Sequence, residues 1–388
     1  MYFAPVRKLI NQRDDLINQR NLASQIGAKR VLHHQPQRNS GNSAITQLNL
    51  CETDDSNLIS RTIIAYKKAI RTNVGSEDSM WLNQIQSANE ETHRTLESGD
   101  TQAIVNMLRN PSNSMLLYGF DSNFKTDANK VNEVSWWAEW LKLLAYDSLL
   151  QLSRAIGIRR VEYPESGIES NEAPDVELLL QELDSKFGFK IDFPNVFPGE
   201  IGLDTSRGIA NIRAVYALHQ AYRIRELMTN KCISGWEGGR VIEIGAGLGR
   251  TAYYAIKMGI KSYTIIDLPL TNVAQSYYLG RVLGSERISL YTENHQNQIA
   301  ILPPIAFHEL DEHYDLILNV DSMTEMAKQT ACDYLDKSSK ISPLLLSINH
   351  EYNSFTIMQL LKERNDVKFW RSPYWLRRGY VEEIIEFI

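Results

Sequence analysis

Three glycines and an acid stand close together in the second half of this 388-residue chain. The sequence VIEIGAGLGR at 241–250 places the glycines directly after a short apolar run, and Glu243 precedes the first of them by two residues. Glycines in such a turn let the backbone bend tightly and approach a ligand closely. A dinucleotide fingerprint, G-x-G-x-x-G, would require glycine where Arg250 stands. The acid beside the turn disfavours a pyrophosphate and favours a ligand that carries an ammonium group.

A second acid follows at a spacing that suits a nucleoside. Asp267 lies 22 residues after Gly245 and directly follows the apolar run 263–266. A carboxylate at the end of such a strand can accept hydrogen bonds from two ribose hydroxyls. Nicotinamide cofactors and S-adenosylmethionine both contain this ribose, so Asp267 by itself does not discriminate between them.

These residues belong to a pattern of alternating strands and helices. We predict strands at 241–244, 263–266, 287–291, 315–320 and 343–349, helices at 249–259, 270–282 and 324–336, and a final edge strand at 380–388. Strands that alternate with helices of this length predict βαβ units. The expected fold class is therefore α/β, with a doubly wound, mostly parallel sheet.

The first half of the chain has the pattern of a mainly helical domain. Apolar residues recur at helical spacing in 58–85, 131–156 and 176–187, a connector rich in Pro, Gly and Phe occupies 188–208, and a helix is predicted at 207–228. The tryptophans Trp136, Trp137 and Trp140 form a stripe that we assign to the core. We place the domain boundary near residue 200, with a helical domain at 1–200, a loosely ordered basic arm at 1–57, and a second domain at 201–388.

The second domain resembles the class I S-adenosylmethionine-dependent methyltransferases, and more narrowly the sugar O-methyltransferases of bacterial polysaccharide gene clusters. The stretches that carry the resemblance are FPNVFPGE at 193–200, TSRG at 205–208, EIGAGLG at 243–249, IDLP at 266–269, NVDSMTEM at 319–326 and SINHE at 347–351. LYGFD at 117–121 extends it into the helical half. The resemblance implies a Rossmann-like fold and S-adenosyl-L-methionine as the cofactor.

The resemblance also implies which residues bind that cofactor. Asp267 would accept from the ribose with Leu268 packed beside it, and Glu243 would lie near the methionine part. The full set comprises Glu243, Gly245, Ala246, Gly247, Gly249, Asp267, Leu268, Asn319, Val320, Asp321 and Ser322, of which the last four would lie beside the sulfonium and the acceptor. Asp321 fits a helix cap equally well.

Methyl transfer to a hydroxyl needs alignment of the acceptor and one general base. His350 is our first candidate because it follows the strand at 344–348, at the edge of the sheet where such folds build their sites. Glu351 could orient its imidazole or bind an acceptor hydroxyl. Glu325 and Asp321 are the alternative bases. His219, in an apolar helix, is assigned to the core.

No metal site is predicted. His308 and His313 are five residues apart, about 140° around a helix, so they could not face one ion. A magnesium ion is neither required nor excluded by the carboxylates. Near the end of the chain, Arg371, Arg377 and Arg378 stand with Tyr374 and Trp375, and the cluster could grip the phosphates of a nucleotide-linked sugar or form a solvated edge loop.

The composition of the chain limits the classes of partner and the compartment that we expect. The formal charge of −6 argues against a whole-protein surface for nucleic acid, and the three scattered cysteines favour a reducing compartment. No stretch has the length of a transmembrane helix or the apolar core of a secretory signal. We therefore expect a cytoplasmic protein without membrane insertion, with a sugar, nucleotide-sugar or glycan acceptor; a homo-oligomer is compatible with the sequence.

The resulting hypothesis is an O-methyltransferase that acts on a sugar hydroxyl in surface polysaccharide or glycan biosynthesis. Three alternatives stay open. The chain could methylate an oxygen or nitrogen of another small metabolite, or bind S-adenosylmethionine as a non-catalytic subunit. A nicotinamide-dependent oxidoreductase is disfavoured by Arg250 in place of the third fingerprint glycine.

Overall fold

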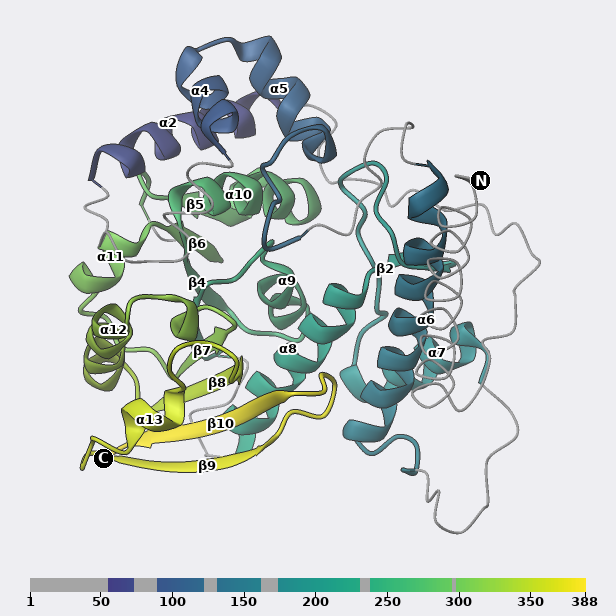
Figure 1. Ribbon diagram of the computed structural model, residues 1–388, viewed down its shortest axis with the longest axis vertical. Helices are drawn as coiled ribbons and strands as arrows, with labels where there is room; N and C mark the ends of the chain where they lie inside the picture. Colours follow the sequence, from purple (N-terminus) through teal and green to yellow (C-terminus); the bar gives the residue numbers. More distant parts are fainter. Residues whose placement is uncertain (1–54, 73–88, 122–130, 162–173, 231–237, 295–297) are drawn as a thin grey trace, which may run out of the picture.

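A twisted sheet with helices on both faces forms the body of the molecule (Figure 1). The computed structural model describes residues 55–72, 89–121, 131–161, 174–230, 238–294 and 298–388. Within them, the main sheet has eight strands in the order β5 (Ile288–Leu290), β6 (Ile299–Leu302), β4 (Ser262–Ile266), β3 (Arg240–Ile244), β7 (Leu316–Val320), β8 (Leu344–His350), β10 (Tyr380–Phe387) and β9 (Val367–Pro373).

The topology of this sheet is doubly wound. All neighbours from β5 to β8 are parallel, and β10 is antiparallel to both β8 and β9. From β3 the chain moves outward through β4 to the edge strand β5 and adds β6 between them. It then returns to add β7 and β8 on the other side of β3. The predicted α/β, Rossmann-like fold class is confirmed, and the point where the strand order reverses is where such sheets bind ligands.

The end of the chain differs from its prediction. The strand at 380–388 is confirmed, but its placement at the edge of the sheet is wrong: β10 lies between β8 and β9, and β9 is the edge. Glu382 and Glu383 are buried, and they are neutralised by Arg223 and Arg371 respectively. An interior strand therefore carries acids because each has its own arginine.

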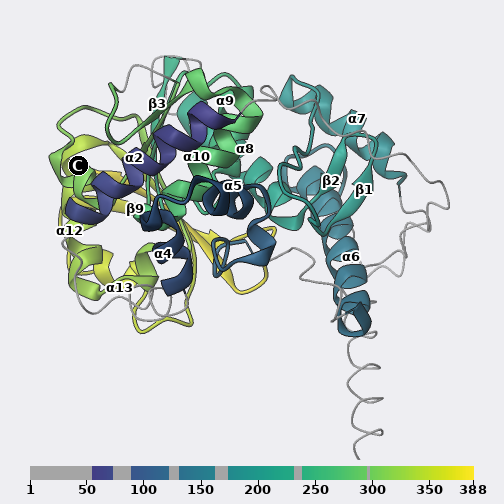
Figure 2. The same cartoon turned by 90° about the horizontal axis from the view of Figure 1, so that it is seen from above.

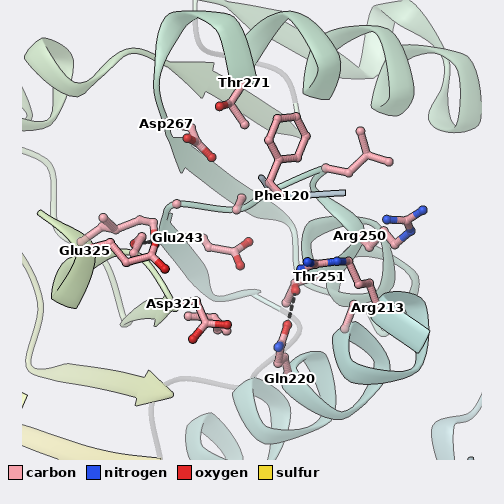
Figure 3. A pocket seen from close by; sticks show the side chains of 18 of the residues that line it. Phe120, Arg213, Gln220, Glu243, Arg250, Thr251, Asp267, Thr271, Asp321 and Glu325 are labelled. Atoms are coloured by element: carbon pink, nitrogen blue, oxygen red, sulfur yellow. Dashed lines mark hydrogen bonds between the residues drawn. The ribbon is translucent and has the colours of Figure 1, made fainter. Parts of the chain in front are cut away.

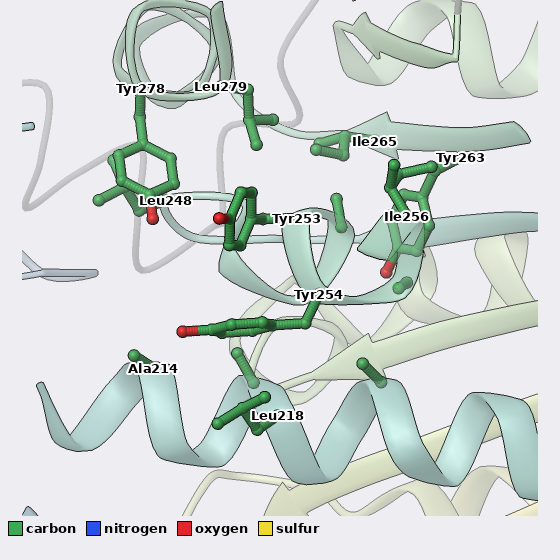
Figure 4. Packing of buried hydrophobic residues seen from close by; sticks show 14 of the residues in the cluster. Ala214, Leu218, Leu248, Tyr253, Tyr254, Ile256, Tyr263, Ile265, Tyr278 and Leu279 are labelled. Atoms are coloured by element: carbon green, nitrogen blue, oxygen red, sulfur yellow. The ribbon is translucent and has the colours of Figure 1, made fainter. Parts of the chain in front are cut away.

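The two faces of the sheet carry different helices. On one face, α8 (Ile212–Asn230), α9 (Arg250–Lys257) and α10 (Pro269–Leu283) pack on strand residues such as Val241 and Ile265 (Figure 4). On the other, α11 (Pro304–Glu309), α12 (Lys328–Ile341) and α13 (Ile357–Leu361) contribute to a core that holds Ile242 and Ile244. Successive residues of β3 thus serve opposite faces, as the pleat requires.

The first half of the chain is mainly helical in its described residues. Its helices are α2 (Ser56–Thr72), α4 (Glu90–Ser98), α5 (Thr101–Arg109), the 3-10 turn η1 (Pro111–Asn113), α6 (Val131–Ala155) and α7 (Val176–Phe187). The predicted helices at 131–156 and 176–187 are confirmed. The helix predicted to begin at 207 begins at 212, because β1 (Leu203–Thr205) and β2 (Gly208–Ala210) form a small hairpin first. Trp140 is half-buried, and the side chains of Trp136 and Trp137 lie outside the described set.

Two groups of helices lie on different sides of the sheet (Figure 2): one comprises α2, α4 and α5, and the other comprises α6 and α7. The α2, α4 and α5 group lies over α10, where the absence of a side chain at Gly280 admits Leu58 of α2. Buried Asp55 secures this contact by pairing with Arg109 and Arg281, and its hydrogen bond from Arg109 lowers its pKa to about 2. One continuous apolar cluster contains residues from both sides of position 200.

Among the helices of the described residues, none is both long and apolar enough to cross a bilayer. The basic arm at 1–57 lies outside the described residues as far as residue 54. Its last residues are ordered, since Asp55 is buried and Ser56 begins α2.

A buried ion-pair network joins the helical half to the glycine turn. Arg250, the first residue of α9, binds Asp121 through Nη1 and Glu200 through Nη2, the latter at 2.6 Å. All three side chains are less than a tenth exposed. Asn195 adds a hydrogen bond to Glu200 at 2.7 Å. Asp121 and Glu200 belong to two of the stretches that the sequence analysis singled out, and Arg250 stands where a dinucleotide fingerprint has glycine.

Loss of this cation should destabilise the fold strongly. Arg250→Met leaves two carboxylates buried without a counter-charge, and we expect the free energy of unfolding to fall by about 3–5 kcal/mol in urea unfolding. Lys328→Met is the matched control, because its pair with Glu363 is 54% and 70% exposed and should contribute under about 1 kcal/mol. Equal losses in the two variants would contradict a structural role for the network.

Candidate functional site

A cavity of about 360 Å³ lies at the carboxyl ends of β3, β4, β7 and β8 (Figure 3). This is the edge where parallel sheets of this topology bind ligands. Most of the residues predicted from the sequence line it, namely Glu243, Gly245, Ala246, Gly247, Asp267, Leu268, Val320, Asp321, Ser322, Glu325 and His350. Gly249, Asn319 and Glu351 do not.

The three glycines of the turn have different roles. All have positive φ, which favours glycine. A Cβ at Gly245 would lie 2.3 Å from the Cβ of Ser322, and one at Gly249 would lie 2.9 Å from Leu279 of α10, so these two positions permit close packing. A Cβ at Gly247 would have only Phe120 within 4 Å, at 4.0 Å. Gly247 is therefore the position where the backbone is open to a ligand in the cavity.

Glu243 lies at the centre of the cavity wall. Its side chain is 2% exposed, and Tyr263 donates a hydrogen bond to its Oε2 at 2.8 Å. Burial raises the pKa of this carboxyl to about 8, the Tyr263 hydroxyl opposes that shift, and the charge of Asp267 adds to it. A carboxyl of this kind is protonated at neutral pH until a cation arrives beside it.

Asp267 is held ready at the end of β4. Its Oδ1 accepts from the Leu268 amide at 2.8 Å, and its Oδ2 accepts from Gln275 Nε2 at 2.7 Å. The same Gln275 nitrogen donates to the carbonyl of Gly247 at 2.8 Å, so one amide fixes both the acid and the turn. Burial raises the pKa of Asp267 to about 6, against these hydrogen bonds. Sequence analysis missed Gln275, whose only signal is its position eight residues after Asp267.

The end of β7 is organised by a buried amide. Asn319 does not line the cavity; its Nδ2 donates to the Ile244 carbonyl at 3.0 Å, and its Oδ1 accepts from Asn349 at 3.1 Å. It therefore positions the residues that follow it. Asp321 has a φ of +57°, which among the described residues occurs outside glycine only here. Its Oδ2 accepts from Arg377 at 2.6 Å.

The structure separates the proposed base from its proposed partner. His350 lines the cavity, and its Nδ1 accepts from the Tyr352 amide at 3.3 Å. That long contact favours the tautomer with the proton on Nε2. Glu351 points away, into a two-pronged pair with Arg371 at 2.7 and 2.8 Å, which lowers its pKa. Glu351 therefore does not orient the imidazole here.

The remaining candidates lie where their neighbours place them. Glu325, at the end of a 3-10 turn (Met323–Glu325), lines the cavity. Arg377 also lines it, whereas Arg371 and Arg378 do not. His219 is confirmed as a core residue: it is 4% exposed, and its Nδ1 shares a hydrogen bond with Tyr374. Among the described side chains, no group of three His, Cys, Asp or Glu is placed to hold a metal ion.

Helix α8 supplies cavity residues that the sequence analysis missed. Arg213, Tyr216 and Gln220 line the cavity, and Gln220 accepts a hydrogen bond from Thr251 of α9 at 2.6 Å. Their spacing of three and four residues puts them on one helix face. That spacing was visible in the sequence, but nothing local distinguishes this face from one that meets the core. Phe120, next to Asp121 of the buried network, covers the turn from the helical half.

Comparison with known proteins finds similarity of structure but not of sequence. No family model matches the chain, and no curated protein matches it. Among solved structures, a protein from Pyrococcus horikoshii described as a putative RNA methyltransferase is similar over 46% of this chain and 83% of its own, with 16% identity and a TM-score of 0.31. Magnesium protoporphyrin IX methyltransferase from Synechocystis with bound S-adenosylmethionine is similar over 44% of this chain and 81% of its own, with 11% identity and a TM-score of 0.33. An O-methyltransferase from Bacillus cereus in complex with S-adenosylhomocysteine is similar over 44% of this chain and 80% of its own, with 12% identity and a TM-score of 0.32.

Proposed function

We propose that this chain is an S-adenosylmethionine-dependent methyltransferase. The observation that carries the proposal is the arrangement of one cavity: an open glycine turn, a buried acid beside it, and a second acid at the end of the adjacent strand. The glycine turn would let the backbone approach the cofactor closely, the buried acid would lie near its methionine part, and the second acid would accept hydrogen bonds from its ribose. The methyltransferases that are similar in structure agree with this proposal without adding to it.

The residues present fit the cofactor chemically. Gly247 leaves space that a side chain would fill, and Asp267 presents a carboxylate to two ribose hydroxyls. Burial raises the pKa of the Glu243 carboxyl, and the ammonium of the methionine part would stabilise its charged form. When bound, S-adenosylmethionine supplies a methyl group on a sulfonium that an acceptor oxygen can attack.

We further propose that the acceptor is a sugar hydroxyl, in polysaccharide or glycan biosynthesis. Support comes from the resemblance of the motifs at 193–208 and 319–351, and from the chemistry of the other end of the cavity. Tyr216, Tyr380 and His350 there offer ring faces beside hydrogen-bonding atoms, a combination suited to a sugar. His350 would take the hydroxyl proton through a ring nitrogen, with Asp321 and Glu325 as the alternative bases.

Asp267→Ala should weaken binding of S-adenosylhomocysteine by about 10- to 100-fold, because two hydrogen bonds to a charged group are lost. Isothermal titration calorimetry measures this directly. Asp311→Ala, whose side chain is 97% exposed, is the control and should bind as the parent protein does. Unchanged affinity in the Asp267 variant would remove the ribose assignment.

Binding of S-adenosylhomocysteine should tighten as the pH rises from about 6 toward the Glu243 pKa of about 8. The free protein holds a proton on Glu243 in this range, and a bound ammonium favours the carboxylate, so binding releases that proton and higher pH assists it. Calorimetry in buffers of different ionisation enthalpy counts the released protons. Glu243→Gln should bind more weakly and release fewer; an unchanged proton count would place the ammonium elsewhere.

His350→Asn should lower kcat by about 100-fold or more while the affinity for S-adenosylhomocysteine stays the same. Glu325→Gln and Asp321→Asn are measured in parallel with methyl transfer to a panel of sugars and nucleotide sugars. Near-parental turnover of the His350 variant would move the base to whichever carboxylate variant fails.

A further inference from the structure

Arg213 is a cation inside the cavity that the methyl-transfer chemistry does not use. It lies in the first turn of α8, is half-buried, and extends its side chain from the helix into the cavity (Figure 3). In the part of the chain that the structure describes, its guanidinium has no hydrogen bond and no ion pair. The other arginines of the cavity differ: Arg250 has two carboxylates, and Arg377 has Asp321.

The position of Arg213 assigns it to the acceptor end of the cavity. Burial raises the pKa of both Tyr216 and Tyr380, and the charges of Arg377 and Arg213 oppose the rise in each. Tyr216 follows Arg213 by three residues on the same face of α8, and its ring lies 5.2 Å from the Arg377 guanidinium. Arg213 therefore lies on the side of the cavity that Tyr216, Arg377 and Tyr380 line.

Arg377 completes the environment. Its guanidinium lies 3.5 Å from the centre of the Tyr380 ring and 5.2 Å from that of Tyr216, and it donates to the Tyr380 hydroxyl as well as to Asp321. Arg377 is thus paired with Asp321, and the charge of Arg213 acts on the same two phenol rings from a half-buried position.

We propose that Arg213 receives an anionic group of the acceptor, so that the substrate is a sugar that carries a carboxylate or a phosphate. This rests on the proposed function in taking the β7–β10 end of the cavity as the acceptor site. A half-buried guanidinium gains most from an oxyanion that it can bind with two parallel hydrogen bonds. Tyr216 and Tyr380 then contact the sugar ring, while the anion fixes its orientation relative to His350.

The test is calorimetric binding of three probes, glucose 1-phosphate, glucuronate and glucose, with and without S-adenosylhomocysteine. We expect at least one anionic probe to bind about 10- to 100-fold more tightly than glucose, and the phosphate and carboxylate probes tell which anion is taken. Arg213→Gln should abolish the difference, and Arg213→Lys should retain part of it. Arg378→Gln, an exposed arginine outside the cavity lining, should retain all of it.

Several outcomes would overturn the proposal. Equal binding of the three probes, or no detectable binding of either anion, means that the cavity has no anion subsite. If Arg213→Gln weakens S-adenosylhomocysteine and keeps the anion preference, Arg213 serves the carboxylate of the cofactor instead. Failure of the parent protein to bind S-adenosylhomocysteine would refute the proposed function itself. This outcome is distinguishable from loss of the anion subsite, because the probes are also titrated in the absence of S-adenosylhomocysteine.

Discussion

The site depends on one buried guanidinium. Arg250 starts the helix that follows the glycine turn, and its two carboxylate partners come from segments 50 and 129 residues earlier in the chain. Removing Arg250 would leave two carboxylates in the interior without a counter-charge, so this one cation holds both segments to the turn. Phe120 is attached to this network through Asp121 and therefore stays above Gly247. The helical half of the chain is thus part of the cavity wall.

The cavity has opposite electrostatic character at its two ends. At the glycine turn, burial has raised the pKa of Glu243 and Asp267, so both acids gain from a ligand that offers a cation or hydroxyl donors. At the β7–β10 end, Arg377 is paired with Asp321, and Arg213 has no carboxylate partner among the described residues. A ligand pair with a cationic group at one end and an anionic group at the other satisfies both. Desolvation by the protein creates this asymmetry, and it does so before any ligand arrives.

Sequence reasoning succeeded where the information is local. The turn at 241–250 and the acid at 267 are fixed by strand, glycine and spacing, and both lie where they were expected. It failed where a partner is distant. Gln275 and Arg213 become site residues only through the packing of α10 and α8, and Glu351 was joined to His350 by adjacency although Arg371 turns it away. Adjacency in sequence predicts little at a strand end, because successive side chains face opposite directions.

The position of β10 in the sheet explains how Arg377 and Tyr380 reach the cavity. Because β10 is inserted between β8 and β9, the turn before it reaches the carboxyl end of β8, and this delivers Arg377 and Tyr380 to the cavity. Arg377 then holds Asp321, whose left-handed backbone is tolerated only where the surroundings fix it. The antiparallel strand therefore does more than close the sheet: it orders the loop after β7, and with it the end of the cavity where an acceptor would meet the methyl group.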